Sequence, residues 1–269
     1  MNKITIIRTV FLFFLVTLTC AIIGSPIIAD LLHTEKLVID TDGGGDDIIT
    51  ILLVLLAYKK QISNYKVVGI TCTYGNTDEK SVEKNVLEAL TLANESLIPV
   101  YGGAQKPLAS TFTSDHFFGI DGFGDFKFDK TITAKVDESM HAAMALVQLA
   151  KKYQGQLNIL SVGPQTNIAM AIALDSQFIH NVKRFYIMGG SVSGIGNIKP
   201  ADIMCAAVMM WPDLITKSVT CNVSPILEGE GKGAVMVDYF NRHKKFKNAQ
   251  IIQELQVSVY QQKVLEVFS

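Results

Sequence analysis

Apolar and polar residues follow one another in blocks that predict strands followed by helices. Residues 36–39 form a short apolar run typical of a buried strand, and the longer apolar stretch 48–58 predicts a helix. The same order returns further along the chain. Later strands are predicted at 66–73, 98–101, 157–162 and 184–188, and later helices at 81–94, 139–152 and 168–174. Strands that alternate with helices favour an α/β, Rossmann-like fold, an open and mostly parallel sheet with helices on both faces.

Two segments in the middle of the chain add detail to this pattern. The helix at 139–152 is amphipathic, and its apolar side is predicted to be Met140, Ala143, Met144, Val147 and Ala150. Residues 102–130 contain no predicted element, which is long for a connection in a compact domain. We therefore expect this loop to be functional or mobile.

The first thirty residues differ from the rest in kind. Lys3 and Arg8 precede the apolar run 10–23, and Gly24, Ser25 and Pro26 follow it. This order is typical of a secretory signal peptide, whereas an uncleaved anchor helix is the rival interpretation because apolar residues resume after the proline. The small residues and the proline favour cleavage, at a point between residues 24 and 29. We predict a signal peptide at 1–29, a single domain at 30–269 and a secreted, extracellular protein without a membrane segment after cleavage.

Charge and cysteine content exclude some classes of function. The formal net charge is −1, and the 24 Lys and Arg residues are spread along the chain, so no basic surface for a nucleic acid polymer is expected. After signal removal three cysteines remain, Cys72, Cys205 and Cys221, with no CxxC spacing. An odd number of cysteines in this arrangement indicates neither a disulfide framework nor a zinc site.

The turn after the first strand concentrates negative charge. Asp40, Asp42, Asp46 and Asp47 place four carboxylates in eight residues, with three glycines between them. Capping of the following helix explains two of these carboxylates, but four repel one another unless a positive charge lies among them. Ca²⁺ takes oxygen ligands, whereas zinc would favour His or Cys, and no phosphate-binding loop accompanies the motif to favour magnesium. The turn therefore predicts a divalent cation site, with Ca²⁺ the favoured ion.

Two other turns are expected to meet the acidic turn. Asn76 follows the second predicted strand, and Thr166 follows the strand at 157–162. In parallel sheets the carboxyl ends of the strands share one edge, and ligands bind there. Asn76 could instead only tolerate a left-handed turn, Thr166 could only cap a helix, and Asp121 sits in a glycine-rich loop where turn chemistry alone would explain it.

Five ordered segments resemble motifs of the inosine-uridine-preferring nucleoside hydrolases. The acidic turn at 40–47 is similar to the DTDPGxDD signature, with Gly43 where proline usually stands. The other segments, 68–71 with 75–76, 119–124, 162–169, and 188–190 with 196–197, resemble the second strand with its asparagine, the HGxDGLG loop, the VGPLTNIA segment and the MGG segment. The resemblance implies calcium-dependent hydrolysis of the N-glycosidic bond of ribonucleosides to ribose and free base. It also implies a small-molecule nucleoside as partner and a possible homo-oligomer.

The resemblance also implies roles for single residues. Asp42 would be a metal ligand and the base that takes a proton from water, and Asp46 would hold a ribose hydroxyl. Asp40 would support the turn from behind. The remaining implied metal ligands are Asp47, the Thr166 carbonyl and Asp202, and the remaining implied substrate contacts are Asn76, Met188 and Asn197.

The chain departs from the family pattern after Asn197. The family's acidic-aromatic-asparagine motif and the elements around it are missing, and residues 199–201 lead directly into a segment resembling the late helix that carries a His-Asp pair. Asp202 stands at the aspartate, and Ala201 stands where the family often has the histidine. Residues 221–238 resemble the C-terminal strand and its return strand. A skipped exon or incomplete gene model near 199–201 is the simplest explanation, and a naturally shortened loop is the alternative. An impaired enzyme, or an inactive calcium-binding relative, is therefore expected.

Overall fold

The computed structural model describes residues 34–109, 111–189, 202–226, 229 and 234–269. The chain divides into two units, Met1–Glu35 and Lys36–Ser269, and the description below concerns the second. The predicted signal peptide, Asn197 and the junction at 199–201 lie outside the described residues. Within the described residues, every helix is too short or too polar to cross a membrane.

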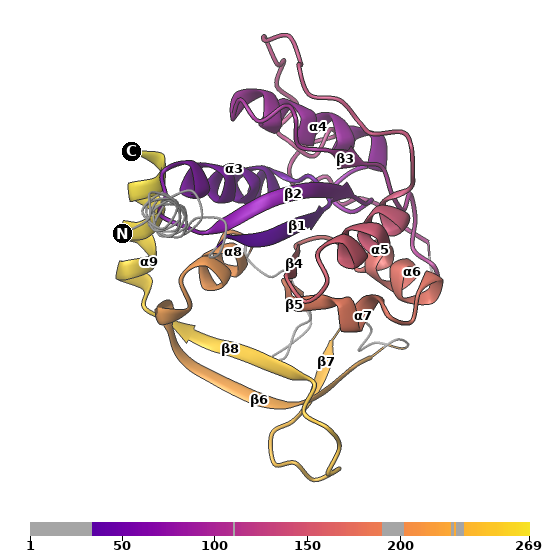
Figure 1. Ribbon diagram of the computed structural model, residues 1–269, viewed down its shortest axis with the longest axis vertical. Helices are drawn as coiled ribbons and strands as arrows, with labels where there is room; N and C mark the ends of the chain where they lie inside the picture. The colour runs from indigo at the N-terminus through magenta and orange to yellow at the C-terminus, as the bar shows by residue number, and fades with distance from the viewer. Residues whose placement is uncertain (1–33, 110, 190–201, 227–228, 230–233) are drawn as a thin grey trace, which may run out of the picture. The chain divides into compact units, whose positions relative to one another are not determined.

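Five strands form the central sheet (Figure 1). They are β1 (Glu35–Thr41), β2 (Tyr65–Cys72), β3 (Val100–Tyr101), β4 (Leu157–Ser161) and β5 (Val182–Ile187). Their order across the sheet is β3-β2-β1-β4-β5, and the pairs β1 with β4, β4 with β5 and β2 with β3 are parallel. The order places β1 in the centre, so the turn that follows it lies in the middle of the carboxyl edge.

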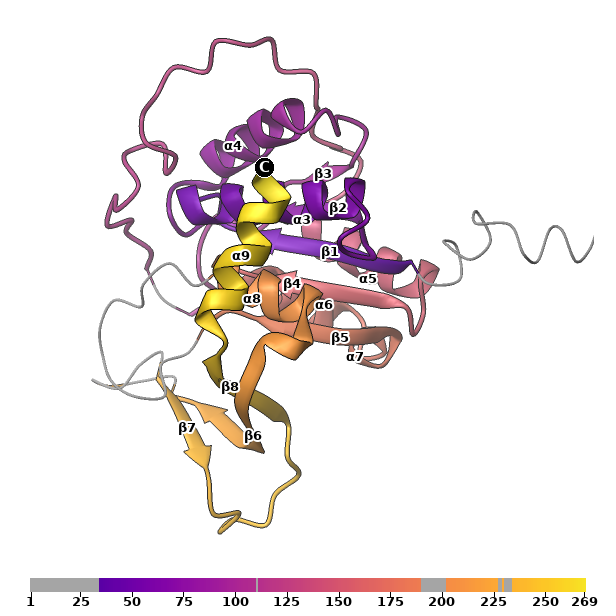
Figure 2. The same cartoon turned by 90° about the vertical axis from the view of Figure 1, so that its left-hand side faces the viewer.

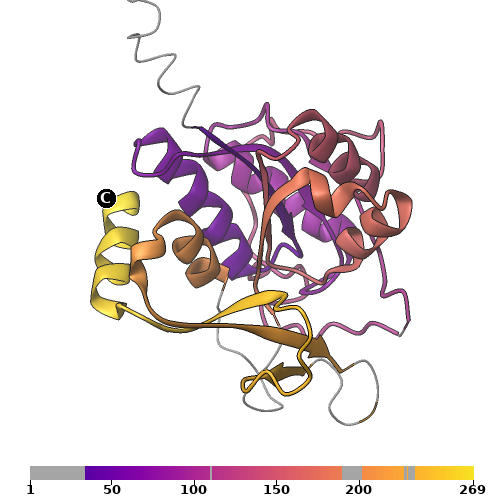
Figure 3. The same ribbon diagram turned by 60° about the horizontal axis from the view of Figure 1, so that its bottom comes forward.

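Helices cover both faces of this sheet, as predicted. Successive side chains of a strand point to opposite faces, and Leu37 and Ile39 of β1 therefore enter a different core cluster from Val38. The first cluster includes residues of α3 (Gly45–Lys59), α4 (Glu79–Leu92), α8 (Asp202–Met210) and α9 (Val257–Phe268). The second includes residues of α5 (Ala142–Lys152), α6 (Thr166–Leu174) and α7 (Phe178–Asn181), on the other side of the sheet in Figure 3. The prediction of an open α/β sheet is confirmed.

The amphipathic helix predicted at 139–152 needs a correction. It begins at Ala142, because the His141 side chain caps it by accepting a hydrogen bond from Ala143 N at 3.1 Å. Its buried side was also placed slightly wrongly, since Met144 is 41% exposed while Leu146 and Leu149 are buried. Residues 142–150 of this helix are all apolar except Gln148, so periodicity alone gave the wrong boundary of the buried face.

A second, smaller sheet follows in the C-terminal part. The strands β6 (Ile215–Pro225), β7 (Val235–Asp238) and β8 (Ala249–Leu255) pair in the order β7-β6-β8, and both pairs are antiparallel. The β6 and β7 pairing confirms the expected strand and return strand. A short 3₁₀ helix, η1 (Pro212–Leu214), joins α8 to β6, and neither β8, α9 nor α7 was predicted.

The long connection between β3 and α5 has no helix or strand among its described residues, apart from a single bridge between Val136 and Val100. It passes outside α4 in both views (Figures 1 and 2). Its central part contacts the carboxyl edge of the sheet, as described below. The free thiols of Cys72 and Cys221 are buried, and that of Cys205 is half-buried.

Candidate metal and active site

The acidic turn is folded tightly by glycine and by Asp47. Gly43 has a left-handed backbone, with φ of +64°, and a Cβ there would lie 2.8 Å from Val82 Cγ1 on α4. Gly44 is the N-cap of α3, and its N–H donates to Asp47 Oδ2 at 3.1 Å. The Thr41 hydroxyl donates to Asp47 Oδ1. Asp47 therefore bonds to the N-terminus of α3, which is the capping role expected from the sequence. Helix capping does not explain the other carboxylates of the turn.

Three carboxylates come together at the start of α3 and α8. Asp46, Asp47 and Asp202 each offer an oxygen, and these oxygens lie within 4.8 Å of one another. Burial, followed by repulsion from Asp47 and Asp46, raises the pKa of Asp202 to about 10. Its Oδ1 is buried and has no hydrogen-bond partner among the residues that the structure describes. An unpartnered buried oxygen in an all-carboxylate set fits a hard divalent cation, because the ion would both bind this oxygen and offset the repulsion among the three carboxylates.

Asp42 follows β1 and lies beside Asp47 of this cluster. Its Oδ2 accepts a hydrogen bond from Asn76 N at 3.1 Å, and burial followed by repulsion from Asp47 raises its pKa well above the ordinary value. Gly75 and Gly163 pack closely around it, since a Cβ on Gly75 would lie 1.9 Å from Asp42 Oδ2 and one on Gly163 would lie 2.8 Å from Asp42 N. The turns after β1, β2 and β4 thus converge on Asp42, as the sequence predicted.

The other predicted site residues that the structure describes, two substrate contacts and the metal ligand Thr166, have different surroundings. The Asn76 amide donates to Asp47 Oδ2 at 3.2 Å, so it faces the acidic turn. Thr166 is the first residue of α6 rather than its cap, which is Gln165, and the helix-cap alternative is therefore wrong. Its hydroxyl lies 3.1 Å from the Tyr74 hydroxyl. Met188 follows β5, half-buried against the first core cluster, and its N–H donates to Ser161 O at 2.9 Å.

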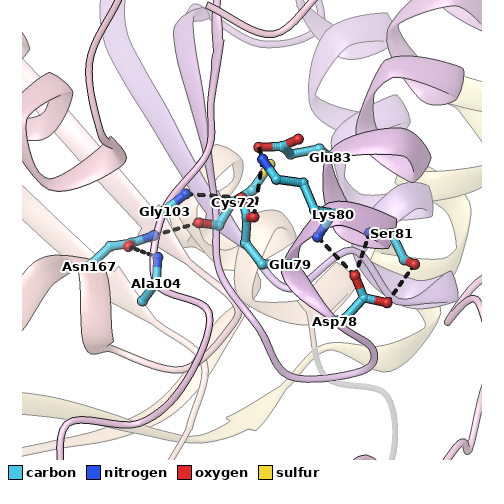
Figure 4. Close-up of polar contacts among 9 residues, drawn as sticks. All are labelled: Cys72, Asp78, Glu79, Lys80, Ser81, Glu83, Gly103, Ala104 and Asn167. Carbon is cyan, nitrogen blue, oxygen red and sulfur yellow. Dashed lines mark hydrogen bonds and ion pairs between the residues drawn. The ribbon is translucent and has the colours of Figure 1, made fainter. Parts of the chain in front are cut away.

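Asp40 lies behind the turn and is fully buried. Its Oδ1 accepts hydrogen bonds from Thr71 Oγ1 at 2.6 Å and Asn167 Nδ2 at 2.9 Å, but burial outweighs them and raises its pKa to about 6. Asn167 was not predicted as a site residue. It also donates to Cys72 O at 2.8 Å and accepts from Ala104 N at 2.9 Å, so it joins three chain segments (Figure 4). The only sign in the sequence that Asn167 belongs to the site was its position in the VGPQTNIA segment.

The loop at 112–126 packs against the same edge of the sheet. Ser114 Oγ donates to Asn76 O at 2.6 Å, and Thr77 Oγ1 donates to Ile120 O at 2.9 Å. A Cβ on Gly45 would lie 3.0 Å from the Phe118 ring, which therefore rests on the first turn of α3. Asp121 Oδ1 accepts hydrogen bonds from the backbone of Phe123 and Asp125, at 2.7 and 2.9 Å, which confirms a turn role for this aspartate.

An open parallel sheet with a buried cluster of carboxylates at its carboxyl edge defines a ligand site of the kind found in α/β enzymes. Residues 37–202 match the inosine-uridine preferring nucleoside hydrolases, and the chain belongs to this family. The resemblance drawn from the five motifs is therefore confirmed.

Relatives agree with this assignment. Over 172 residues the chain is 35% identical to probable uridine nucleosidase 1 of Oryza sativa subsp. japonica, covering 63% of this chain and 51% of the relative. Over 169 residues it is 34% identical to uridine nucleosidase 1 of Arabidopsis thaliana, covering 62% and 48%. The chain thus spans about half the length of the curated relatives that it matches. The fold is similar to that of an inosine-guanosine nucleoside hydrolase, with a TM-score of 0.77 and 19% identity over 86% of this chain and 98% of that one.

Proposed function

We propose that this chain hydrolyses the N-glycosidic bond of ribonucleosides such as inosine and uridine, and that the reaction depends on Ca²⁺. The observation that carries the proposal is the buried, unpartnered Oδ1 of Asp202 beside Asp46 and Asp47. Membership of the family supports the reaction class. The carboxylate and amide oxygens of the site support a hard cation such as calcium.

The implied ligands and the clustered carboxylates overlap without being identical. The resemblance puts Asp42, Asp47, Asp202 and the Thr166 carbonyl on the ion and Asp46 on the ribose, whereas the clustered oxygens belong to Asp46, Asp47 and Asp202. We assign Asp47 and Asp202 to the ion because both arguments agree on them. Asp42 is retained as a ligand because it lies beside Asp47.

Asp42 is proposed as the general base. When bound, calcium supplies positive charge that keeps the carboxylates ionised and lowers the pKa of a coordinated water. Asp42 would take one proton from the attacking water, whose oxygen forms a bond to C1′ of the ribose. The C1′–N bond breaks with its electron pair going to the base, which is released after it gains a proton. Without a cation, burial and the neighbouring Asp47 raise the pKa of Asp42, which favours the protonated carboxyl over the carboxylate that accepts this proton.

Turnover is tested by incubating the purified chain with inosine or uridine and measuring the free base by chromatography. Release of base that is lost with chelator, restored by Ca²⁺ and abolished in Asp42→Asn supports the proposal. Asp213→Asn is the matched control, because Asp213 is an exposed aspartate in η1 and should leave turnover unchanged. Absence of turnover in the calcium-loaded wild-type chain would contradict the enzymatic function.

An inactive calcium-binding relative is the second candidate, and a specific observation favours it. The chain lacks the acidic-aromatic-asparagine motif, and Ala201 replaces the histidine that often protonates the leaving base. Loss of a general acid costs about 10²- to 10⁴-fold in rate. Calorimetry distinguishes the two candidates, because calcium binding that depends on Asp202 but is accompanied by no base release would establish the non-enzymatic relative.

We also propose that the protein is secreted, on the basis of the basic, apolar and small-residue order in residues 1–29. Expression of the full chain in a secretory cell, with N-terminal sequencing of the protein in the medium, tests this proposal. A mature N-terminus that begins between residues 25 and 30 supports it, and retention of the uncleaved chain in membranes overturns it.

Light scattering on the same sample measures whether the chain forms the proposed homo-oligomer.

A further inference from the structure

Asn85 links two segments that are far from it in the sequence. It lies on α4, and its side chain is fully buried. Its amide nitrogen donates to Gly43 O at 3.0 Å and to Asp121 O at 2.8 Å. Gly43 belongs to the acidic turn, between Asp42 and Asp46, and Asp121 belongs to the loop at 112–126. A single amide group therefore joins the turn that carries the carboxylates to the loop that packs beside them.

The chemistry of Asn85 suits this linking role. A side-chain amide has two N–H donors, and both are directed to backbone carbonyls here. Because both neighbours are acceptors, only the nitrogen end of the amide fits against them. The Oδ1 of Asn85 is buried and has no hydrogen-bond partner within the described part of the chain. Burial of this oxygen without a partner costs free energy, so the side chain is explained by its two donated hydrogen bonds rather than by the packing of α4.

The surrounding contacts make Gly43 a sensitive point of the site. The left-handed Gly43 is pressed against Val82, three residues before Asn85 on the same helix. Its neighbour Asp42 carries the proposed base, and Asp47 is bonded to the next backbone N–H at Gly44. A shift of the Gly43 carbonyl would therefore move carboxylates on both sides of it. The hydrogen bonds of Ser114 and Thr77 hold the loop to the turn after β2, and the Phe118 ring contacts the first turn of α3 without a hydrogen bond to the acidic turn among the described residues.

We propose that Asn85 is a positioning residue that couples the loop at 112–126 to the acidic turn, so that cation binding and the order of the loop at the proposed ribonucleoside site depend on each other. The coupling is reciprocal by thermodynamic linkage. An ion that orders the turn also orders the loop through the Asn85 amide, and an ordered loop favours binding of the ion to the same extent. This inference rests on the proposed function for its substrate. Its structural part, the coupling of loop order to the cation, stands without turnover.

Hydrogen exchange of the loop amides is the first test, performed with and without Ca²⁺. In the wild-type chain, Ca²⁺ should slow exchange at residues 119–124. In Asn85→Leu, which keeps similar volume but has no donor, exchange in calcium should be about tenfold faster and nearly independent of the ion, as expected for the loss of two hydrogen bonds. Val86→Ala is the matched control, since Val86 is buried on the same helix but faces the core cluster.

Kinetics and ion titration provide the second test. Asn85→Leu should weaken Ca²⁺ binding by about tenfold and raise KM by a similar factor, with kcat changed much less, whereas Val86→Ala should lower only the thermal midpoint. Asn85→Asp should be worse than Asn85→Leu, because it places a carboxylate against two carbonyls. Equal loop exchange in wild type and both folded Asn85 variants would overturn the coupling. A wild-type chain without turnover but with calcium-dependent loop exchange would overturn the enzymatic function and leave the coupling intact.

Discussion

The side-chain amide of Asn76 donates a hydrogen bond to Asp47 Oδ2 at 3.2 Å, across a separation of 29 residues. The backbone N–H of the same asparagine donates to Asp42 Oδ2 at 3.1 Å. One residue of the turn after β2 therefore orients two carboxylates of the turn after β1. Asn76 therefore orients the carboxylates of the acidic turn, in addition to the contact with the sugar that the resemblance implies.

Asn76→Ala should weaken Ca²⁺ binding. A hydrogen bond to a charged group is worth about 1.5–3 kcal/mol, which corresponds to a roughly 10- to 100-fold change in the dissociation constant if Asp47 loses its orientation. Isothermal titration calorimetry measures this change. Asn94→Ala is the control, because Asn94 is exposed beyond the end of α4. Equal affinities in wild type and Asn76→Ala would show that the amide does not prepare Asp47 for the ion.

Asp202→Asn should have opposite effects in chelator and in calcium. Burial and the neighbouring Asp47 and Asp46 raise the pKa of Asp202 to about 10, so the ion-free fold must keep protonated a carboxyl that is ionised in the unfolded chain, and a neutral asparagine should therefore raise the thermal midpoint. In wild type, Ca²⁺ at about 100 times its dissociation constant should add about 2.7 kcal/mol, or roughly 5–10 °C. The variant should lose most of that gain. Differential scanning fluorimetry in both conditions tests this crossover, and a calcium-induced rise of the same size in the variant would exclude Asp202 as a ligand.

Gly75→Ala should impair the site without unfolding the chain. A Cβ at this position would lie 1.9 Å from Asp42 Oδ2, so the carboxylate must move away. A displacement of about 1 Å in a reacting group costs about 10²-fold in rate, and we expect kcat/KM to fall by about that factor. Gly155→Ala is a stringent control, because its backbone is left-handed but nothing lies within 4 Å of the added carbon. It should lower stability and leave kcat/KM unchanged.

The sequence was sufficient for the central sheet and for the convergence of three turns at its carboxyl edge. Apolar runs predicted β1, β2 and β4, and the rule that parallel strands share one carboxyl edge predicted that the turns after β2 and β4 meet the acidic turn, where Asn76 and Gly163 lie against Asp42. The short α7 and the elements β8 and α9 were missed. Residues 249–268 alternate irregularly between apolar and polar positions, and much of their apolar surface stays half exposed, so the pattern was weak.

The links within the site could not be predicted because they join positions with no sequence relationship. Asn85 lies 42 residues from Gly43, and Asn167 lies 127 residues from Asp40. An asparagine in a helix is ordinarily read as a surface or capping residue, and only the packing of α4 and α6 against the sheet shows that both are buried. Local patterns predict elements and turns, whereas the partners of buried amides depend on tertiary contacts.

Glu79 gives a pH dependence of stability opposite in sign to that of an ordinary salt-bridged carboxylate. It lies beside Glu83 and Lys80 at the start of α4, and its Oε1 accepts a hydrogen bond from Gly103 N at 3.0 Å (Figure 4). Burial, followed by the neighbouring Glu83, raises the pKa of Glu79 from 4.5 to about 7. The folded state therefore binds a proton that the unfolded state has already released between these values, and stability falls as pH rises from about 4.5 to about 7.

Glu79→Gln should remove this dependence, because glutamine is neutral at every pH and resembles the protonated acid. Urea unfolding of the calcium-saturated chain between pH 5 and pH 7.5 measures it, with saturating Ca²⁺ keeping the carboxylates of the acidic turn ionised throughout. Wild type should lose stability relative to the variant as pH rises, and Glu95→Gln, which removes a partly exposed partner of Lys59, should follow the wild-type slope. Parallel curves for wild type and Glu79→Gln would show that Glu79 stays ionised over this range, with Lys80 compensating for both carboxylates.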